Sequence, residues 1–195
     1  MEYSTQGQTA AGRYAQLQSA RSTFDREAKE SSKLTIPSLI PESTTGTRAK
    51  IKTPFQAVGA RGVNSLASKL LFALLPPSTA FFKLSIDSLE LLKQGQEGLE
   101  TEIDKGLRTI ETALMNEIEI SNDRVAMFEA LKHLIVGGNV LLYLTDDGLK
   151  VYPLSKFVCK RDAVGNVLEI ITQESVNANA LSPEFLEQIK KKENY

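Results

Sequence analysis

The chain has 195 residues, of which 42% are hydrophobic and 24% are charged, a composition typical of folded globular proteins and not of disordered or fibrous ones. Its 23 Lys and Arg residues nearly balance 24 Asp and Glu residues, and a formal net charge of -1 disfavours a dedicated duplex-binding protein, which is usually basic. The single cysteine, Cys159, excludes an internal disulfide and a structural zinc site built on thiolates.

Neither a secretion signal nor a membrane span is expected. Residues 1–11 are polar and lack the apolar core of a signal peptide. The longest apolar runs, at residues 70–77 and 134–144, are broken by Pro or Gly before they reach the length of a membrane-spanning helix. We therefore expect the protein to be made in the cytoplasm.

The N-terminal region is predicted to form an amphipathic helix over residues 8–33, because apolar residues recur there near the helical period. Residues 35–46 hold two prolines and a Ser/Thr cluster, which predicts an extended loop. Arg48, Lys50 and Lys52 follow as a short basic run, which we interpret as a solvated surface.

The next predicted helix extends from Pro54 to about Leu75. Thr53 can act as its N-cap, Pro54 can take the first helical position, and Gln56 stands where a capping-box partner belongs. Pro76-Pro77 ends the pattern. Its apolar residues cover a wide stripe, which favours a largely buried helix: Val58, Val63, Leu66, Leu70, Phe72 and Leu74.

Residues 81–86 alternate in polarity, which predicts a short strand or an extended edge. A second helical region is expected over residues 87–122, interrupted near Gly95 and Gly98. Its later half carries an apolar seam, interpreted as ordinary core packing and not as a coiled coil, because it lasts under three heptads. The seam consists of Leu99, Ile103, Leu107, Ile110, Leu114 and Ile118.

The C-terminal third changes from helical to strand-like patterns. A helix from Asp123 should stop at Gly137-Gly138. Two hairpins follow, residues 139–152 with a turn at Asp147-Gly148 and residues 156–172 with a turn at 162–166. A short charged helix is expected over residues 182–192. The chain is thus predicted to be α+β, mainly helical over 1–138 and a small antiparallel sheet of β-hairpins over 139–175.

The residues that could carry catalysis are few. His133 is the only histidine and lies between Leu131 and Leu134 in a helical stretch, where a structural role is more common than a catalytic one. The glycine-rich segment 59–62 follows no strand and lacks the Gly-Lys-Ser/Thr ending of a phosphate-binding loop, so we interpret it as a site of close helix packing.

The carboxylates likewise do not form a recognisable site. Asp146 and Asp147 fit a hairpin turn, because the EF-hand pattern is absent. Five others crowd one side of the second helical region, where they are expected to keep the surface solvated: Glu97, Glu100, Glu102, Asp104 and Glu111. We predict no catalytic, cofactor-binding or metal-ligating residue, no cofactor, and no enzymatic activity.

Three long segments resemble the portal proteins, or head-to-tail connectors, of short-tailed podoviruses of the autographivirus type. They are TPFQAVGARGVNSLASKLLFALLP at residues 53–76, FEALKHLIVGGNVLLYL at 128–144 and RDAVGNVLEIITQE at 161–174, and TIPSLIP at 35–41 also fits. The similarity covers nearly all of the chain in the order and spacing of that family, and strings of this length are much more specific than a short motif.

The resemblance implies a homo-oligomeric ring, usually a dodecamer, at one capsid vertex of the virion after assembly in the host cytoplasm. Double-stranded viral DNA would enter through its channel during packaging and leave through it on infection. The implied partners are the major capsid and scaffolding proteins, the terminase large subunit and the tail adaptor proteins, with no membrane. The terminase, and not the portal, would hydrolyse ATP. The resemblance assigns no DNA-contacting residue and no subunit-interface residue.

By the same resemblance, residues 1–195 would be the N-terminal part of a portal protein, in the wing region, and the stem, tunnel and crown would lie outside this sequence. The alternative from a different class is a truncated, stand-alone interaction module, derived from a portal, that binds capsid, scaffold or terminase without forming a channel.

Overall fold

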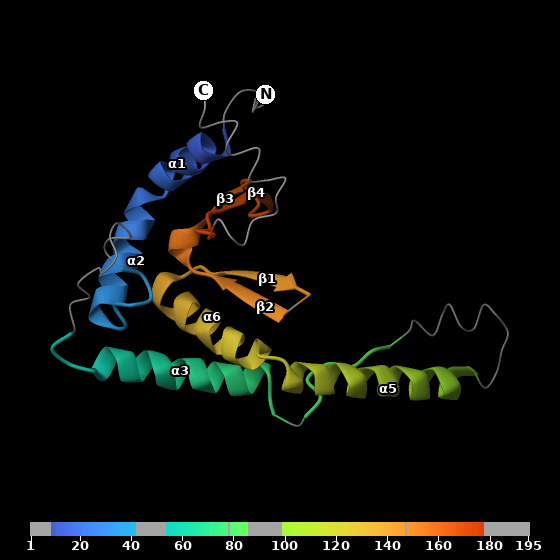
Figure 1. Cartoon of the computed structure of the whole chain (residues 1–195). Coiled ribbons are helices and arrows are strands. Elements are labelled where there is room, and N and C mark those ends of the chain that lie inside the picture. The colour runs from blue at the N-terminus through green and yellow to red at the C-terminus, as the bar shows by residue number, and fades with distance from the viewer. Residues whose placement is uncertain (1–8, 42–53, 78, 86–98, 147, 178–195) are drawn as a thin grey trace. The chain divides into compact units, whose positions relative to one another are not determined.

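The computed structural model describes residues 9–41, 54–77, 79–85, 99–146 and 148–177. In chain order, the helices are α1 (Ala10–Ala20), α2 (Ser22–Leu34), α3 (Val58–Leu74), α5 (Leu99–Ile120) and α6 (Asp123–Gly137). The strands β1 (Leu141–Thr145), β2 (Gly148–Tyr152), β3 (Phe157–Arg161) and β4 (Val167–Thr172) follow, with the 3-10 turn η1 (Leu154–Lys156) between the two pairs (Figure 1). The α+β class is confirmed, although the strands form two separate two-stranded antiparallel sheets.

The chain divides into two compact units, residues 1–17 with 156–195 and residues 18–155. In the first unit, β3 and β4 pair from Phe157 opposite Thr172 to Arg161 opposite Val167, with an irregularity at Lys160 and Arg161. Arg13, from the N-terminal segment, donates from Nε and Nη2 to Oε2 of Glu169 on β4, at 3.0 and 2.9 Å. This pair connects the two ends of the chain within the first unit.

The second unit is organised around α6. This helix packs against α3, α2 and β2, and it makes a smaller contact with α5. The shared core consists of small and branched side chains, with Val63 and Ala67 from α3 and Ala130, Leu131 and Val136 from α6. Burial of apolar side chains in a densely packed core of this kind contributes most to the stability of a folded unit.

The two ends of α6 are fixed by polar contacts. Arg124 donates to the carbonyl oxygens of Leu75 and Pro76 at 2.6 and 3.1 Å, which satisfies acceptors left at the end of α3. Asp123 accepts the Leu149 N–H at 2.8 Å and so connects the start of α6 to β2. At the other end Gly138 adopts a left-handed conformation with φ of 71°, as the predicted glycine stop requires.

The single helix predicted over residues 8–33 is wrong in one respect, because a turn at Arg21 divides it into α1 and α2. The sequence has no Gly or Pro there. Instead, the Arg21 side chain bonds elsewhere: it pairs with Asp25 at 2.8 Å and donates to the carbonyl oxygen of Leu154 at 2.9 Å. The contact with Leu154 joins residues far apart in the sequence, so the local pattern does not predict it.

The predicted start of α3 is also wrong. The helix begins at Val58, its N-cap is Ala57, and no side chain caps it. Pro54 lies outside the helix, and Phe55 is fully exposed, so the cap signal around residues 53–56 is overridden. The predicted end is confirmed, since the last helical hydrogen bond runs from the Leu75 N–H to Leu71.

Residues 81–85 form no strand. The Leu84 N–H donates to Oε1 of Glu111 on α5 at 2.6 Å, so a side chain takes the place of a partner strand. Residue 86 and the first part of the second helical region, 87–98, lie outside the described residues, as do residues 42–46 of the loop predicted over 35–46.

Both hairpins are confirmed. β1 pairs with β2 from Leu141 opposite Tyr152 to Thr145 opposite Gly148. In the second turn, Asp162 accepts the N–H groups of Val164 and Asn166 at 3.0 and 2.7 Å. The short helix predicted over 182–192 lies outside the described residues.

Candidate functional site

The outer face of α3, opposite its contact with α6, is apolar and exposed. Val58, Leu66 and Phe72 are 62%, 46% and 62% exposed, although Val63 and Ala67 on the inner face are buried. The expectation of a largely buried helix is therefore wrong for the described chain. The wide apolar stripe seen in the sequence predicts a second contact in addition to the one with α6, and the described part of the chain leaves the outer face exposed.

The seam of α5 is the second uncovered apolar surface. Ile110 and Leu114 are 50% and 44% exposed, and Ile103, Leu107 and Ile118 are only partly covered. The helix itself is confirmed from Leu99 to Ile120, but the interpretation of its seam as ordinary core packing is wrong for the part of the chain that is described. Uncovered patches that combine several large apolar side chains usually mark interaction surfaces.

The two surfaces differ in charge. Arg61 and Lys69 are the only charged residues of α3, both basic. On α5, Glu117 is exposed and borders the seam, and the exposed Asp104 lies at its edge, one turn before Arg108. Helical geometry places Lys105 on the other side of the helix. The outer face of α3 is thus apolar and basic, and the seam of α5 is apolar and acidic.

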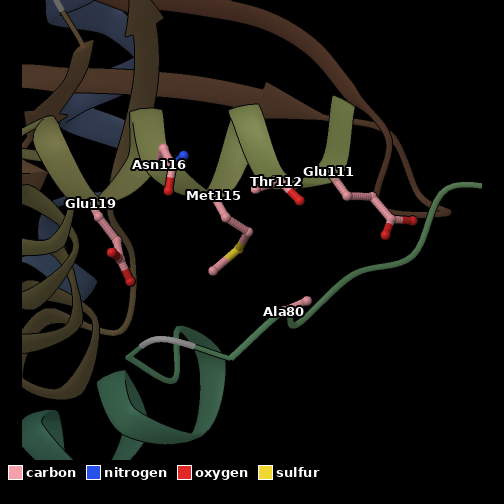
Figure 2. Close-up of a pocket in the computed structure, with 6 residues that line it drawn as sticks. All are labelled: Ala80, Glu111, Thr112, Met115, Asn116 and Glu119. Atoms are coloured by element: carbon pink, nitrogen blue, oxygen red, sulfur yellow. The ribbon is translucent and has the colours of Figure 1, made fainter. Parts of the chain in front are cut away.

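A shallow open pocket of about 260 Å³ lies between α5 and the segment before residue 85. Figure 2 shows the Met115 side chain extending from α5 on the side of the segment that holds Ala80, with Glu119 and Glu111 at the two ends of the row. The carboxylates of Glu111 and Glu119 make this pocket unfavourable for a phosphate and favourable for a basic side chain. Glu111 is already engaged by the Leu84 N–H, so the pocket also has a structural role. The lining residues are Ala80, Glu111, Thr112, Met115, Asn116 and Glu119.

His133 is buried in α6, with 5% of its surface exposed. Its Nε2 lies 3.8 Å from Oε1 of Glu129, and Nδ1 has no hydrogen-bond partner among the described residues. Burial is the main cause that lowers the pKa of His133 below 6.5, partly offset by Glu129. The ring is therefore a neutral group of the interior, which agrees with the structural role inferred from the sequence.

The glycine-rich segment 59–62 has two different roles. At Gly59, an added Cβ would lie 2.6 Å from the carbonyl oxygen of Leu34, so close packing of α3 against the end of α2 requires glycine. At Gly62, an added Cβ would meet nothing within 4 Å. Close packing is thus confirmed for Gly59 and wrong for Gly62, which belongs to the exposed outer face of α3.

The carboxylates considered in the sequence do not converge. Glu102 and Asp104 are exposed, and Glu111 holds the Leu84 N–H. Asp146 follows the end of β1 in the hairpin turn. Glu97, Asp147 and the basic run at residues 48–52 lie outside the described residues, as does the side chain of Glu100. Among the described residues, no group of three or more His, Cys, Asp or Glu side chains could hold a metal ion.

None of the described helices is long and apolar enough to cross a membrane. Cys159, on β3, is a partly buried free thiol.

The chain is similar in sequence to a family of bacteriophage proteins. Residues 7–194 match the family described as bacteriophage head to tail connecting protein. The chain is 40% identical over 185 residues to the portal protein of Escherichia phage T7, covering 91% of this chain and 34% of that protein. It is 40% identical over 189 residues to the portal protein of Enterobacteria phage T3, covering 93% of this chain and 35% of that protein.

A more distant relative, the portal protein of Enterobacteria phage SP6, is 30% identical over 193 residues, which cover 94% of this chain and 36% of that protein. The chain thus spans about a third of the length of these relatives. Because the family match extends over nearly all of its residues, the chain belongs to the bacteriophage head to tail connecting proteins, the portal protein family.

Proposed function

We propose that this chain is part of a portal subunit that assembles with copies of itself into a ring at one capsid vertex. Double-stranded viral DNA passes through the ring during packaging and again during ejection. The observation that carries the proposal is the match to portal proteins over residues 7–194, with 40% identity to two of them. The uncovered apolar faces of α3 and α5 support it, because a protein that functions in an assembly leaves its contact surfaces exposed when alone.

The proposed role is structural. The ring nucleates procapsid assembly together with capsid and scaffolding proteins, docks the terminase large subunit at one end and receives tail adaptor proteins at the other. The match to relatives named portal proteins supports a non-enzymatic role. ATP hydrolysis belongs to the terminase.

The near-neutral net charge is compatible with a conduit. A surface that binds many phosphates tightly holds DNA strongly at physiological salt, which would hinder a moving duplex. A formal net charge of -1 avoids this over the chain as a whole.

The experiment that tests the function is gene replacement in the phage. Particles made without this gene should contain no packaged DNA, and the wild-type gene supplied in trans should restore packaging. A His133→Gln gene should restore it too, because the histidine has no catalytic role. Packaging at normal yield without the gene would overturn the proposal.

The same particles separate the portal from a truncated, stand-alone interaction module. Mass spectrometry of purified virions should identify this sequence in a virion protein, and electron microscopy should locate that protein as a ring at a single vertex. A product that co-purifies with capsid, scaffold or terminase but forms no ring would support the module instead.

A further inference from the structure

We infer that the outer face of α3 in one copy of this chain packs against the apolar seam of α5 in the next copy, in a head-to-tail contact. This inference rests on the proposed ring and names the two surfaces that would build it. It begins from the exposure of Phe72 and Leu66 on α3 and of Ile110 and Leu114 on α5. Within the described residues, α3 uses its other face against α6, and α5 makes only a small contact with α6.

Charge complementarity selects a pairing between the two different surfaces. The α3 surface carries Arg61 and Lys69 and no acidic residue, whereas the exposed Glu117 borders the α5 seam, and α5 has six acidic residues against two basic ones. Two α3 surfaces facing each other would bring basic groups together, and two α5 seams would bring carboxylates together. Such like-charge contacts are unfavourable, so electrostatics favours α3 against α5 and fixes the choice of partner more than the affinity.

The shapes of the surfaces agree with this pairing. Along the outer face of α3, Gly62, Ser65 and Ala73 are exposed and small, and nothing lies within 4 Å of a Cβ built at Gly62. Small residues let two helix backbones approach closely, and the large side chains of the partner then fit between them. In the proposed contact, Ile110 and Leu114 of the α5 seam pack over these small residues.

A contact between two different surfaces of the same chain has a consequence for assembly. Each copy keeps one free α3 surface and one free α5 seam after it has bound a neighbour, so addition continues until the chain of copies closes. A head-to-tail contact therefore builds a ring when the rotation between neighbouring copies closes and an open filament when it does not, whereas a contact of one surface with itself would stop at a dimer.

The first experiment uses two variants of the full-length gene product, one for each surface. Lys69→Glu with Phe72→Glu disables the α3 surface, and Ile110→Glu with Leu114→Glu disables the α5 seam. Each variant alone should lose its rings and sediment as a monomer with an unchanged circular dichroism spectrum. Mixed in equal amounts, the two should form dimers and nothing larger, because only one intact pair of surfaces remains.

The matched control is Arg26→Glu with Val164→Glu, which places the same kinds of change at exposed positions on α2 and in the β3–β4 turn. This control should form rings like the wild type. Rings that persist in either surface variant, or a mixture that stays monomeric, would overturn the inference and leave the proposed ring standing. A wild-type protein that forms no ring would overturn both.

A second experiment avoids disruptive substitutions. In a Cys159→Ser background, Ser65→Cys and Ala113→Cys on the same chain should give a covalent ladder of chain multiples upon mild oxidation. Either cysteine alone should give no ladder and no dimer. Efficient dimers from Ser65→Cys alone would show that α3 meets itself, which contradicts the head-to-tail contact.

Discussion

Exchange of Gly59 for alanine should destabilise the protein, whereas the same exchange at Gly62 should stabilise it. The two positions lie on one helix, three residues apart, and both exchanges add a single methyl group. At Gly59 that group would lie 2.6 Å from the carbonyl oxygen of Leu34 and 3.2 Å from the Cα of Thr35. Both neighbours are backbone atoms, so α3 and the end of α2 must move apart to admit it.

The magnitude follows from two opposing terms. Alanine in place of glycine in a helix gains about 1 kcal/mol from backbone entropy and helix propensity. Forcing a methyl group into a tightly packed site costs about 1 to 3 kcal/mol. At Gly62 only the gain applies, because a Cβ there meets nothing within 4 Å. At Gly59 the cost outweighs the gain.

The assay is equilibrium unfolding in urea, followed by circular dichroism. All proteins are compared as monomers at low concentration, since assembly adds to apparent stability and Gly62 lies on the surface proposed to contact another copy. Gly59→Ala should unfold at lower urea than the wild type and Gly62→Ala at the same or higher urea. Equal midpoints for the two variants would refute the close approach of α3 to the end of α2.

Three further predictions concern polar groups. Burial lowers the pKa of His133, so as the pH falls the unfolded chain binds a proton before the folded protein does. The stability of the folded protein should therefore fall as the pH drops below about 6.5, and in thermal melts the His133→Gln variant should lose less stability over this range. The hydrogen bond from Arg13 lowers the pKa of Glu169, so the pair stabilises the first unit above about pH 4.5, and this stabilisation is lost in acid. Arg13→Ala should therefore lower the melting temperature at pH 7 and not at pH 2. Asp123→Ala should cost about 1 to 3 kcal/mol because the Leu149 N–H loses its acceptor, which faster amide exchange at Leu149 would report, whereas Asp123→Asn should keep most of the stability.

Elements with strong local chemistry were predictable from the sequence. The Gly138 stop, the Asp162 turn and the Pro76-Pro77 end of α3 each depend on residues within a few positions of one another, and the structure has all three. Features set by distant contacts were not predictable. The break at Arg21 accompanies a bond to Leu154, and no local pattern encodes it.

The candidate site was predictable only in part. The seam through Ile110 and Leu114 was visible as a periodic pattern, but periodicity does not say whether its partner is the same chain or another copy. The apolar residues of α3 likewise indicated a wide stripe, of which the described chain covers the part with Val63. Exposure, which only the structure supplies, shows which apolar faces the described residues leave uncovered.

The most direct test of the central claim is electron microscopy of the purified full-length gene product, without other viral proteins. The account predicts closed rings with a central channel, whose number falls when the α3 surface or the α5 seam is disabled. A protein that remains monomeric at high concentration, with no rings in the images, would contradict a role as a portal subunit.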